Sequence, residues 1–377
     1  TLAGCVKPTG KGFFIFDMLP SLQSITPEIL KSQLADWNQP AYRGDQILDW
    51  VYRKRATSLD TMSNLPKGLK EQLGKNFRCH LPDCVQKQGS DDTTQKFLWR
   101  LHDGAMVESV LIPANPALYG EASDRHTLCV STQVGCAYAC KFCASGLDGW
   151  KRNLEPEEIV GQLLAIEHHF LSSLKEGQER KVNNLVIMGM GEPLANYDHL
   201  MKALTIANAP WGCNIGARKI TISTSGLAPQ ISALSKEPFQ FRLAISLHGA
   251  TDEVRSHIMP VNRKYPIEVL MDACKTYLQK KGKMITFEYI LIEGVNDGQD
   301  QIQPLADWAS QLHAKINLIP YNTVEGLPWT RPEADVQESF LEGLLAKGIN
   351  ATLRREKGHD IDAACGQLRL KVEKELA

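Results

Sequence analysis

Residues 135–144 read Gly-Cys-Ala-Tyr-Ala-Cys-Lys-Phe-Cys-Ala, and the rest of the chain is arranged around them. Cys136, Cys140 and Cys143 follow a C-x3-C-x2-C spacing in a short loop of small residues. Thiolates this close in sequence can converge on one metal centre, and three ligands leave one position open for chemistry. Structural zinc sites usually pair their four ligands, and no second pair follows here. Free cysteines are often simply buried, but three within so short a stretch favour the metal centre.

Length, charge and cysteine usage limit the class of protein. The chain has 377 residues, a net charge of −1 and ten cysteines. The length suits one large domain or two to three smaller ones. A charge near zero gives no general attraction to nucleic acid, although local basic clusters remain. The scattered cysteines do not form a secreted disulfide framework, and no bilayer-spanning run or secretory signal occurs, so we predict a cytoplasmic protein without membrane contact.

Residues 1–84 are predicted to contain a small all-helical module. Thr26, Pro27 and Glu28 supply a capping hydroxyl, a proline at the first helical position and an acid in the first turn. Further helices are expected over residues 44–55 and 62–77, the second broken by Pro66. The basic side chains of the module are either a solvated surface or a phosphate-binding face with rings for stacking. They are Arg43, Arg53, Lys54, Arg55, Lys67, Lys70 and Lys75, beside Tyr42, Trp50 and Tyr52.

A β-hairpin is predicted between this module and the rest of the chain. Residues 94–101 and 105–113 alternate apolar and polar side chains around a glycine turn. We expect the hairpin to act as a connector within residues 85–122. Glu108 lies in its second strand, where an acid usually faces water.

From residue 123 to residue 377, strand-like and helical patterns alternate. Apolar runs occupy residues 127–131, 184–189, 219–223, 241–247, 284–292 and 315–320, with an extra one at 351–355. This alternation predicts a parallel sheet covered by helices. Six units are too few for a closed eight-unit barrel. The predicted fold class is therefore α/β, with an open six-stranded β/α barrel.

Polar residues follow several of these runs, at the strand ends where parallel α/β folds bind ligands. The run at 184–189 leads into Gly189, Gly191 and Glu192, where glycine admits a ligand and the acid can pair with an ammonium group. A plain turn with a capping acid is the alternative. Polar residues at the ends of four successive predicted strands together predict a shared ligand pocket. The residues at the later ends are Ser223, Ser225, Ser246, Leu247, His248, Tyr321 and Asn322.

Two further cysteines stand out by their neighbours. Cys365 lies in Gly-His-Asp-Ile-Asp-Ala-Ala-Cys-Gly-Gln-Leu, residues 358–368, between small residues that leave it accessible. Cys129 ends the first run, seven residues before Cys136. Each of them, taken alone, is consistent with a packing thiol.

Taken together, these motifs resemble the radical S-adenosylmethionine (SAM) RNA adenine methyltransferases of the RlmN/Cfr type. The matching stretches are residues 42–50, 127–131, 135–143, 188–193, 246–248, 317–322 and 358–368. The resemblance implies a barrel of radical SAM type and a [4Fe-4S] cluster on Cys136, Cys140 and Cys143, with SAM on the unique iron. The SAM contacts that it implies are Gly191, Glu192, Ser223, Ser246, Leu247, His248 and Asn322.

The activity implied by this resemblance is methylation of adenosine carbon 2 in 23S rRNA, at the peptidyl-transferase centre, and in tRNA, next to the anticodon. That carbon is not nucleophilic, so a radical route is needed. Two SAM molecules are used per turnover: one methylates Cys365, and the other yields the 5′-deoxyadenosyl radical that activates this methyl group for addition to the base. Glu108 matches the proton acceptor. Cys129 then releases the RNA from its covalent adduct by forming a disulfide with Cys365.

The resemblance also implies partners. The helical module and the pair Lys151-Arg152 are expected to hold the RNA by shape and phosphate, with the target adenine out of its stack. A reductant such as flavodoxin or ferredoxin and a monomeric state are further expectations.

Three alternative functions share some or all of these features. A carbon-8 methylating branch, which confers ribosomal antibiotic resistance, has every motif above, and carbon 2 is preferred only as the more widespread activity. A radical SAM enzyme acting on protein or a metabolite would not need RNA or Cys365. A non-catalytic iron–sulfur sensor would bind RNA without cleaving SAM.

Overall fold

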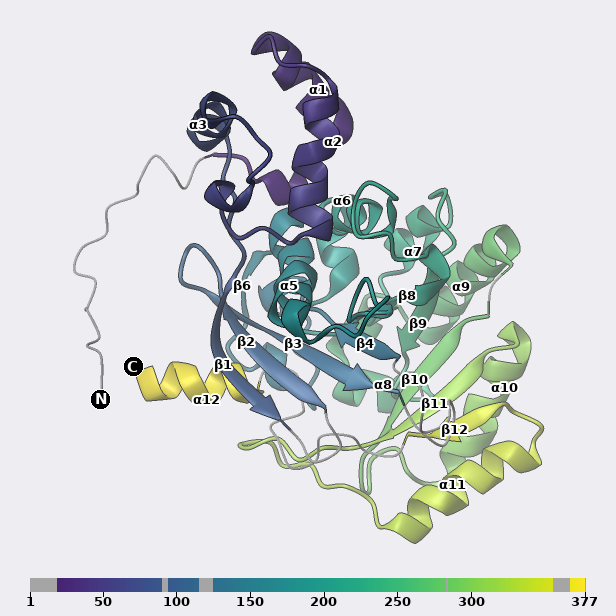
Figure 1. Ribbon diagram of the computed structural model, residues 1–377. Coiled ribbons are helices and arrows are strands. Elements are labelled where there is room, and N and C mark those ends of the chain that lie inside the picture. The colour runs from purple at the N-terminus through teal and green to yellow at the C-terminus, as the bar shows by residue number, and fades with distance from the viewer. Residues whose placement is uncertain (1–18, 90–93, 115–124, 283, 355–366, 377) are drawn as a thin grey trace. The chain divides into compact units, whose positions relative to one another are not determined.

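The structure, a computed structural model, describes residues 19–89, 94–114, 125–282, 284–354 and 367–376 (Figure 1). The predicted carrier cysteine, Cys365, lies outside these ranges. The chain divides into two compact units between His80 and Leu81. The finer division at residues 84 and 122 stays a prediction.

The N-terminal unit is helical, as predicted. Its helices are α1 (Pro27–Asp36), α2 (Tyr42–Leu48), which continues as a π-helical turn (Asp49–Arg53), and α3 (Lys67–Asn76). Thr26 Oγ1 accepts a hydrogen bond from Ile29 N at 3.5 Å, and Pro27 opens α1. Pro66 comes directly before α3 rather than inside a helix, because proline cannot donate the backbone hydrogen bond that a helix interior needs.

The second unit contains a mixed sheet with ten strands in the described part of the chain. From β4 to β12 the strands are parallel, and the order is β1-β2-β3-β4-β7-β8-β9-β10-β11-β12, so β1 and β12 are its two edges. The predicted open barrel is thus confirmed, including its extra strand. The parallel strands are β4 (His126–Cys129), β7 (Asn184–Ile187), β8 (Ile220–Thr224), β9 (Arg242–Ser246), β10 (Thr286–Leu291), β11 (Lys315–Pro320) and β12 (Ala351–Leu353).

The predicted hairpin is present, but it belongs to this same sheet. Its strands are β2 (Gln95–Arg100) and β3 (Met106–Pro113), and β3 pairs antiparallel with β4. An edge strand that the sequence analysis did not foresee, β1 (Asp83–Gly89), pairs with β2. Its residues are mostly polar and exposed, so no apolar alternation marks it. The hairpin therefore extends the barrel wall rather than merely connecting two domains.

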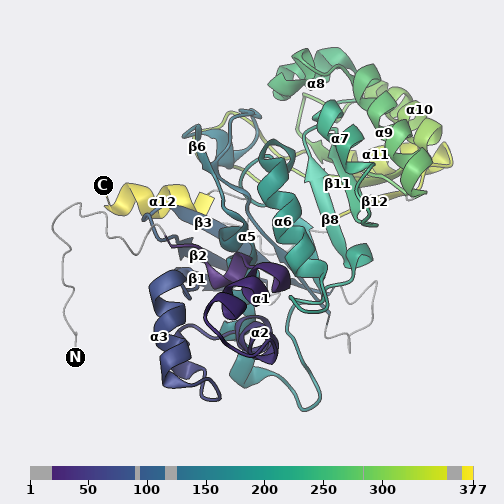
Figure 2. The same cartoon turned by 90° about the horizontal axis from the view of Figure 1, so that it is seen from above.

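Helices follow most of the parallel strands, and several of them pack against a neighbouring helix along the sheet (Figure 2). Apolar side chains of these helices face the core: in α5, for example, Ile159, Leu163 and Ile166 are all buried. These helices are α5 (Pro156–His169), α6 (Tyr197–Asn208), α7 (Ala228–Leu234), α8 (Asp252–Ile258), α9 (Ile267–Lys281), α10 (Ile302–Leu312) and α11 (Ala334–Ala346).

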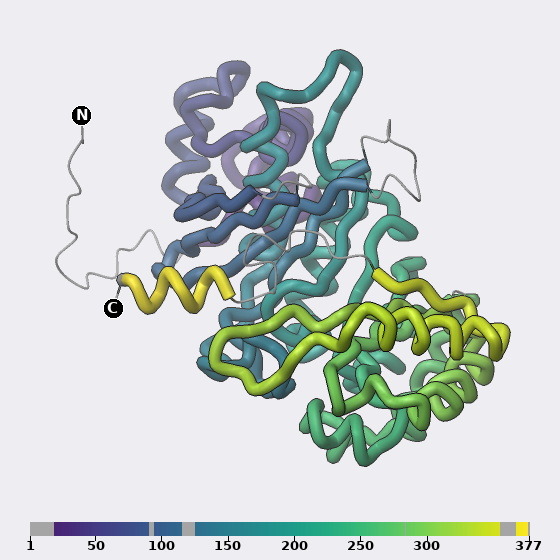
Figure 3. The backbone as a smooth tube through the Cα atoms, turned by 90° about the horizontal axis from the view of Figure 1, so that it is seen from below, coloured from purple at the N-terminus to yellow at the C-terminus, as the bar shows by residue number. Residues whose placement is uncertain are grey.

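The last helix, α12 (Gln367–Leu376), lies apart from α11 (Figure 3). Whereas α11 packs near the β12 edge of the sheet, α12 lies against β3, near the β1 edge. Leu368 and Val372 of α12 form an apolar cluster with Leu98 and Met106 of the hairpin. One face of β2 and β3 is thereby covered by a helix from the far end of the sequence.

Candidate active site

The cysteine loop is closed at its base by a short hairpin of β5 (Gln133–Gly135) and β6 (Trp150–Asn153). Cys136 N donates to Gly149 O at 3.0 Å. Gly135 has φ of +75°, and a Cβ added to it would lie 1.9 Å from Gly149 O. Glycine is therefore needed at the position immediately before the first cysteine.

We expect Gly135→Ala to lower the free energy of unfolding by about 3 kcal/mol, since it combines a backbone clash with an unfavourable φ. Urea unfolding of the cluster-free protein measures this change. Gly104→Ala is the matched control, because Gly104 also has a positive φ, of +84°, but nothing lies within 4 Å of its added Cβ. Equal losses in the two variants would contradict the role given to the Gly149 contact.

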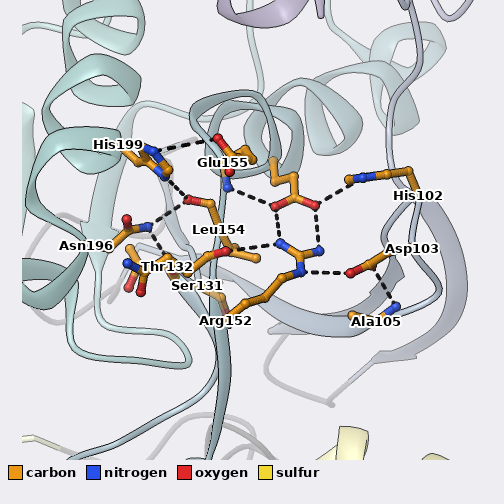
Figure 4. A network of polar contacts seen from close by, with 12 residues as sticks. His102, Asp103, Ala105, Ser131, Thr132, Arg152, Leu154, Glu155, Asn196 and His199 are labelled. Carbon is orange, nitrogen blue, oxygen red and sulfur yellow. Dashed lines mark hydrogen bonds and ion pairs between the residues drawn. The ribbon is translucent and has the colours of Figure 1, made fainter. Parts of the chain in front are cut away.

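Ion pairs hold β6 against the neighbouring elements (Figure 4). Arg152 makes two parallel hydrogen bonds to Glu158 of α5, at 2.7 and 2.9 Å, and Nε donates to Asp103 at 2.7 Å. His102 Nδ1 lies 3.3 Å from the same Glu158 carboxylate. Bidentate pairs of this kind are both strong and directional. These contacts do not support the prediction that Arg152 binds RNA phosphate; they fix the hairpin that carries the cysteine loop.

The three loop thiols influence one another electrostatically. Burial, with smaller contributions from the nearby Cys143 and Glu192, raises the pKa of Cys136 to about 12. Burial raises the pKa of Cys140 well above its ordinary value, with contributions from the other two thiols. Without a bound cation, these groups stay protonated. Metal binding would release their protons, since only the thiolate is a ligand.

The donor set fits an iron–sulfur cluster better than a single metal ion. In the described part of the chain, no three His, Cys, Asp or Glu side chains converge closely enough to bind one ion. A [4Fe-4S] cubane binds each thiolate to a different iron, so its ligands surround the cluster instead of meeting at a point. Three separated thiols on one loop satisfy that requirement.

Glu192 joins the ends of two strands beside this loop. Its Oε1 accepts hydrogen bonds from Leu194 N at 3.0 Å and Thr224 Oγ1 at 2.8 Å, and its Oε2 accepts one from Ser225 N at 2.7 Å. Burial raises the pKa of this carboxyl, while these hydrogen bonds lower it. Gly191, just before it, has φ of +98°, and an added Cβ would lie 2.5 Å from Gln133 Cβ. The motif therefore packs tightly on the base of the cysteine loop.

His248 forms the contact between the end of β9 and the cysteine loop. Its ring meets Phe142 edge-to-face at 4.9 Å, and its Nδ1 accepts a hydrogen bond from Ile290 N at 3.0 Å. The residue has φ of +57°, and Asn296 Nδ2 donates to its carbonyl at 2.7 Å. Burial, followed by the charge of Arg255, lowers its pKa to about 3. The imidazole is neutral, with Nδ1 as its acceptor.

This pKa predicts a loss of stability in acid. The unfolded state binds a proton at His248 below its ordinary pKa of 6.5, whereas the folded state excludes it down to about 3. The free energy of unfolding therefore falls, from this group alone, by about 1.4 kcal/mol per pH unit as the pH drops through that window. His248→Asn keeps an acceptor for Ile290 N but does not titrate. Urea unfolding from about pH 7 to about pH 4 should show a flatter profile for the variant; parallel profiles would contradict the buried neutral imidazole.

A cavity of about 260 Å³ opens beside the loop and brings several predicted residues together. Cys143 and Phe142 of the loop line it, as do Cys129 at the end of β4 and Asn322 after β11. Arg354, which sequence reasoning did not single out, also lines it. The other lining residues are mainly apolar: Thr94, Val110, Ile112, Ala144, Val186, Met188, Ile290, Ile319, Pro320, Tyr321 and Val324.

The remaining predicted SAM contacts lie at neighbouring strand ends but do not line this cavity. Ser223 Oγ, on β8, is 3.4 Å from Ser246 Oγ, on β9. Leu247 N and His248 N both donate to Glu288 O. These residues, with Glu192, form a row of polar strand ends along three adjacent strands. The predicted shared pocket and the residues' contacts with SAM stay predictions.

Arg255 is a buried residue that the sequence analysis missed. Its guanidinium donates from Nε to Leu247 O at 3.0 Å, from Nη1 to Asn262 Oδ1 at 2.6 Å, and from Nη2 to Ser225 O. It thereby ties the ends of β8 and β9 together, and its charge acts on Cys140. A single arginine in a short helix is normally exposed, so the sequence carries no signal for this burial.

Glu108, the predicted proton acceptor, is buried rather than on a wet face. It lies 2.9 Å from Lys96 Nζ, and both side chains are almost inaccessible to solvent. Its Oε1 accepts a hydrogen bond from Arg369 N, at the start of α12. Val110 and Ile112, which follow on the same face of β3, line the cavity, so Glu108 lies next to the cavity wall.

A larger depression, of about 590 Å³, lies near the opposite ends of the strands, where β7 and β8 begin. Both cationic and anionic side chains line it, among them Lys175, Glu176, Glu179 and Lys219. None of the predicted site residues belongs to it, so it is not a candidate for the chemistry.

In the N-terminal unit, several of the predicted basic residues make internal contacts. Arg43 Nη1 donates to Gln46 Oε1 at 2.7 Å, and Lys54 pairs with Asp49 at 3.1 Å while lying 4.0 Å above the Trp50 ring. Tyr42 is exposed. In both units, no described helix has the length and apolar character needed to cross a bilayer.

Comparisons with known proteins give the same family for both units. A profile of the Radical SAM superfamily matches residues 130–309, and one of the ribosomal RNA large subunit methyltransferase N-terminal domain matches residues 21–78. A probable dual-specificity RNA methyltransferase RlmN 3 of Opitutus terrae is 54% identical, covering 94% of this chain and 96% of its own. A probable RlmN of Akkermansia muciniphila is 52% identical, with 95% and 97% covered.

A solved structure agrees with these relatives. The crystal structure of a radical SAM methyltransferase from Sphaerobacter thermophilus has a TM-score of 0.85 and 42% identity, covering 92% of this chain and 98% of that chain. The family predicted from the motifs is confirmed, and with it an enzyme that transfers methyl groups and uses an iron–sulfur cluster and SAM. The chain belongs to the RlmN family of radical SAM RNA methyltransferases.

Proposed function

We propose that this enzyme methylates carbon 2 of an adenosine in both 23S rRNA and tRNA, with Cys365 as the carrier of the methyl group. The observation that supports this most is the cavity in which Cys129, Cys143 of the cysteine loop and Asn322 meet. The relatives' description as dual-specificity RNA methyltransferases supports the two RNA substrates. A cytoplasmic, reducing setting suits a mechanism that depends on free thiols.

Three cysteines would hold the cluster, and strand-end residues would hold SAM. Cys136, Cys140 and Cys143 are the ligands, and the fourth corner of the cluster is left to SAM. Its contacts are Gly191, Glu192, Ser223, Ser246, Leu247, His248 and Asn322. When bound, the cluster and SAM supply the methyl group and the 5′-deoxyadenosyl radical that activates it. We assign two SAM molecules to each turnover.

The remaining steps belong to side chains of this chain. The Cys365 sulfur accepts the methyl group, and its carbon later becomes joined to the adenine, giving a covalent RNA adduct. One hydrogen atom of the methyl group would leave in 5′-deoxyadenosine, and the electron released with the ring proton would return to the oxidised cluster. Glu108 accepts the proton that leaves the ring carbon. The Cys129 thiolate then attacks the Cys365 sulfur; a sulfur–sulfur bond forms, the sulfur–carbon bond breaks, and its electron pair goes to the carbon, which takes up a proton and leaves as the new methyl group. An external reductant then regenerates the two thiols.

The location of Cys129 suits this role. Cys129 is 6% exposed and lines the same cavity as Cys143. A thiol of the C-terminal segment that entered this cavity would therefore lie near both the proposed cluster ligand Cys143 and the proposed resolving thiol Cys129. The N-terminal unit is the proposed RNA-holding part, since its profile match is to the N-terminal domain of ribosomal RNA methyltransferases. A flavodoxin or ferredoxin is the proposed electron donor, and a monomer the proposed state.

Anaerobic turnover with isotopically labelled SAM and RNA tests the proposal. RNA hairpins from the two substrates are digested after reaction, and the nucleosides are compared by mass spectrometry with 2-methyladenosine and 8-methyladenosine standards. Labelled 2-methyladenosine is the expected product. Only 8-methyladenosine would overturn the assignment of carbon 2, and SAM cleavage without any labelled nucleoside would overturn RNA as the substrate.

A further inference from the structure

The start of α12 is held by charged side chains buried between the hairpin and the cysteine loop. Arg369 N donates to Glu108 Oε1 at 2.6 Å, which caps the first turn of the helix with an acid from β3. An acid at this position also interacts favourably with the helix dipole. Lys96 Nζ, 2.9 Å from Glu108 Oε2, balances the charge on this carboxylate.

The side chain of Arg369 connects α12 to the segment that closes the cysteine loop. It is fully buried and lies 3.4 Å from Asp148, in the segment that closes the cysteine loop, and 2.7 Å from Glu373. Lys151 of β6 approaches the same Glu373 at 3.6 Å. The helix therefore makes polar contacts with two hairpins. One is the β2–β3 hairpin, and the other is the β5–β6 hairpin, which carries the cysteine loop.

The end of α12 nearest the cavity also contacts a strand end. Gln367 Nε2 donates to Thr323 O at 3.0 Å, and Thr323 follows the cavity residue Asn322. Cys365 precedes Gln367 by two residues, so the chain can carry its Cα no more than about 7 Å from that of Gln367. Fixing the first turn of α12 therefore restricts the region that the carrier cysteine can reach.

We propose that Lys96, Glu108 and Arg369 form a dock for α12, and that this dock positions Cys365 for methylation. The inference rests on the proposed function, because it needs Cys365 as the carrier. Lys96 and Arg369 are positioning residues, since they act through Glu108 and α12. Glu108 has this docking role in addition to the proton-accepting role proposed above.

Two double variants separate docking from proton acceptance. Lys96→Met/Glu108→Gln removes both charges but keeps an acceptor for Arg369 N, whereas Lys96→Met/Glu108→Leu removes the acceptor as well. Neither variant has a carboxylate to accept a proton, and both avoid leaving one buried charge unpaired. Among the contacts of the described residues, they differ in the hydrogen bond from Arg369 N.

Two measurements are made on the full-length, cluster-loaded protein: hydrogen exchange of the peptide covering residues 367–376, and the methyl mass on the peptide containing Cys365 after anaerobic incubation with SAM. The Leu variant should exchange roughly tenfold faster than wild type at the start of α12 and acquire the methyl group more slowly by a similar factor. The Gln variant should exchange close to wild type at the start of α12 and should acquire the methyl group on Cys365 faster than the Leu variant does. Lys87→Met, in β1 of the same sheet, is a control for removing a lysine.

Equal exchange and equal Cys365 methylation in the two double variants would overturn the dock. If the Leu variant fails to fold, Asp148→Ala decides the question, because Asp148 is half-exposed and its ion pair is with Arg369; faster exchange of α12 supports the dock, and unchanged exchange rejects it. If wild type itself acquires no methyl group, the proposed function fails, and the exchange measurement still tests the dock.

Discussion

Cys365→Ala is expected to abolish methylation of RNA, by more than about 10⁴-fold, as happens when a covalent catalyst loses its nucleophile. The reason is that carbon 2 has no lone pair with which to attack SAM, so without the carrier sulfur the methyl group has no route to the base. Iron content and the fold should stay unchanged. Labelled nucleosides after anaerobic turnover measure the loss, and the mass of the C-terminal peptide measures the missing methyl group.

Cys274→Ala is the matched control for this variant. Cys274 is fully buried in α9 and is neither a loop cysteine nor a residue of the cavity. Its loss should cost stability but not the ability to methylate. Methylated RNA from Cys365→Ala at even a tenth of the wild-type rate would contradict the carrier role and favour an enzyme that transfers the methyl group directly.

Cys129→Ala should trap the RNA on the protein. In the proposed mechanism, the adenine and Cys365 stay joined until the Cys129 sulfur attacks, and Cys129 lies in the cavity wall beside Cys143. Without it, one turnover should leave a covalent adduct that survives denaturation. A denaturing gel with labelled RNA detects the adduct, and digestion followed by mass spectrometry should locate it on the peptide containing Cys365.

A double variant checks where the trapped RNA is attached. Cys129→Ala/Cys365→Ala should give no adduct, since the attachment point is gone. Free RNA and repeated turnover by Cys129→Ala alone would show that another group releases the product, and the role of Cys129 would have to be abandoned.

Much of the fold could be predicted because its signals are local. The parallel strands are short apolar runs buried on both faces, and the capping of α1 by Thr26 needs only neighbouring residues. The cysteine loop is recognisable from spacing alone. By contrast, β1 was missed because its polar residues carry no alternation, and the role of the hairpin as part of the barrel depends on its pairing with β4.

The charged residues show why the rest could not be predicted. Burial of Arg255 is tolerated because the carbonyls of Ser225 and Leu247 accept hydrogen bonds from its guanidinium. Those acceptors lie at strand ends that only the fold brings together. Arg152 was predicted only as an RNA contact, and its hydrogen bonds to Glu158 and Asp103 could not be foreseen. A sequence gives the charge of such a side chain but not its partners, and the partners decide whether burial is tolerated.

The bond between Glu108 and Arg369 joins positions 261 apart in the chain. Contacts of such long range form late, because a large loop must close before they contribute any stability. During synthesis, the β2–β3 hairpin and the cysteine loop emerge from the ribosome well before α12 does. A nascent chain therefore presents its cysteine loop before Glu108 has a helix to bind, and a truncated product that ends before Cys365 would have a cysteine loop without the proposed methyl carrier.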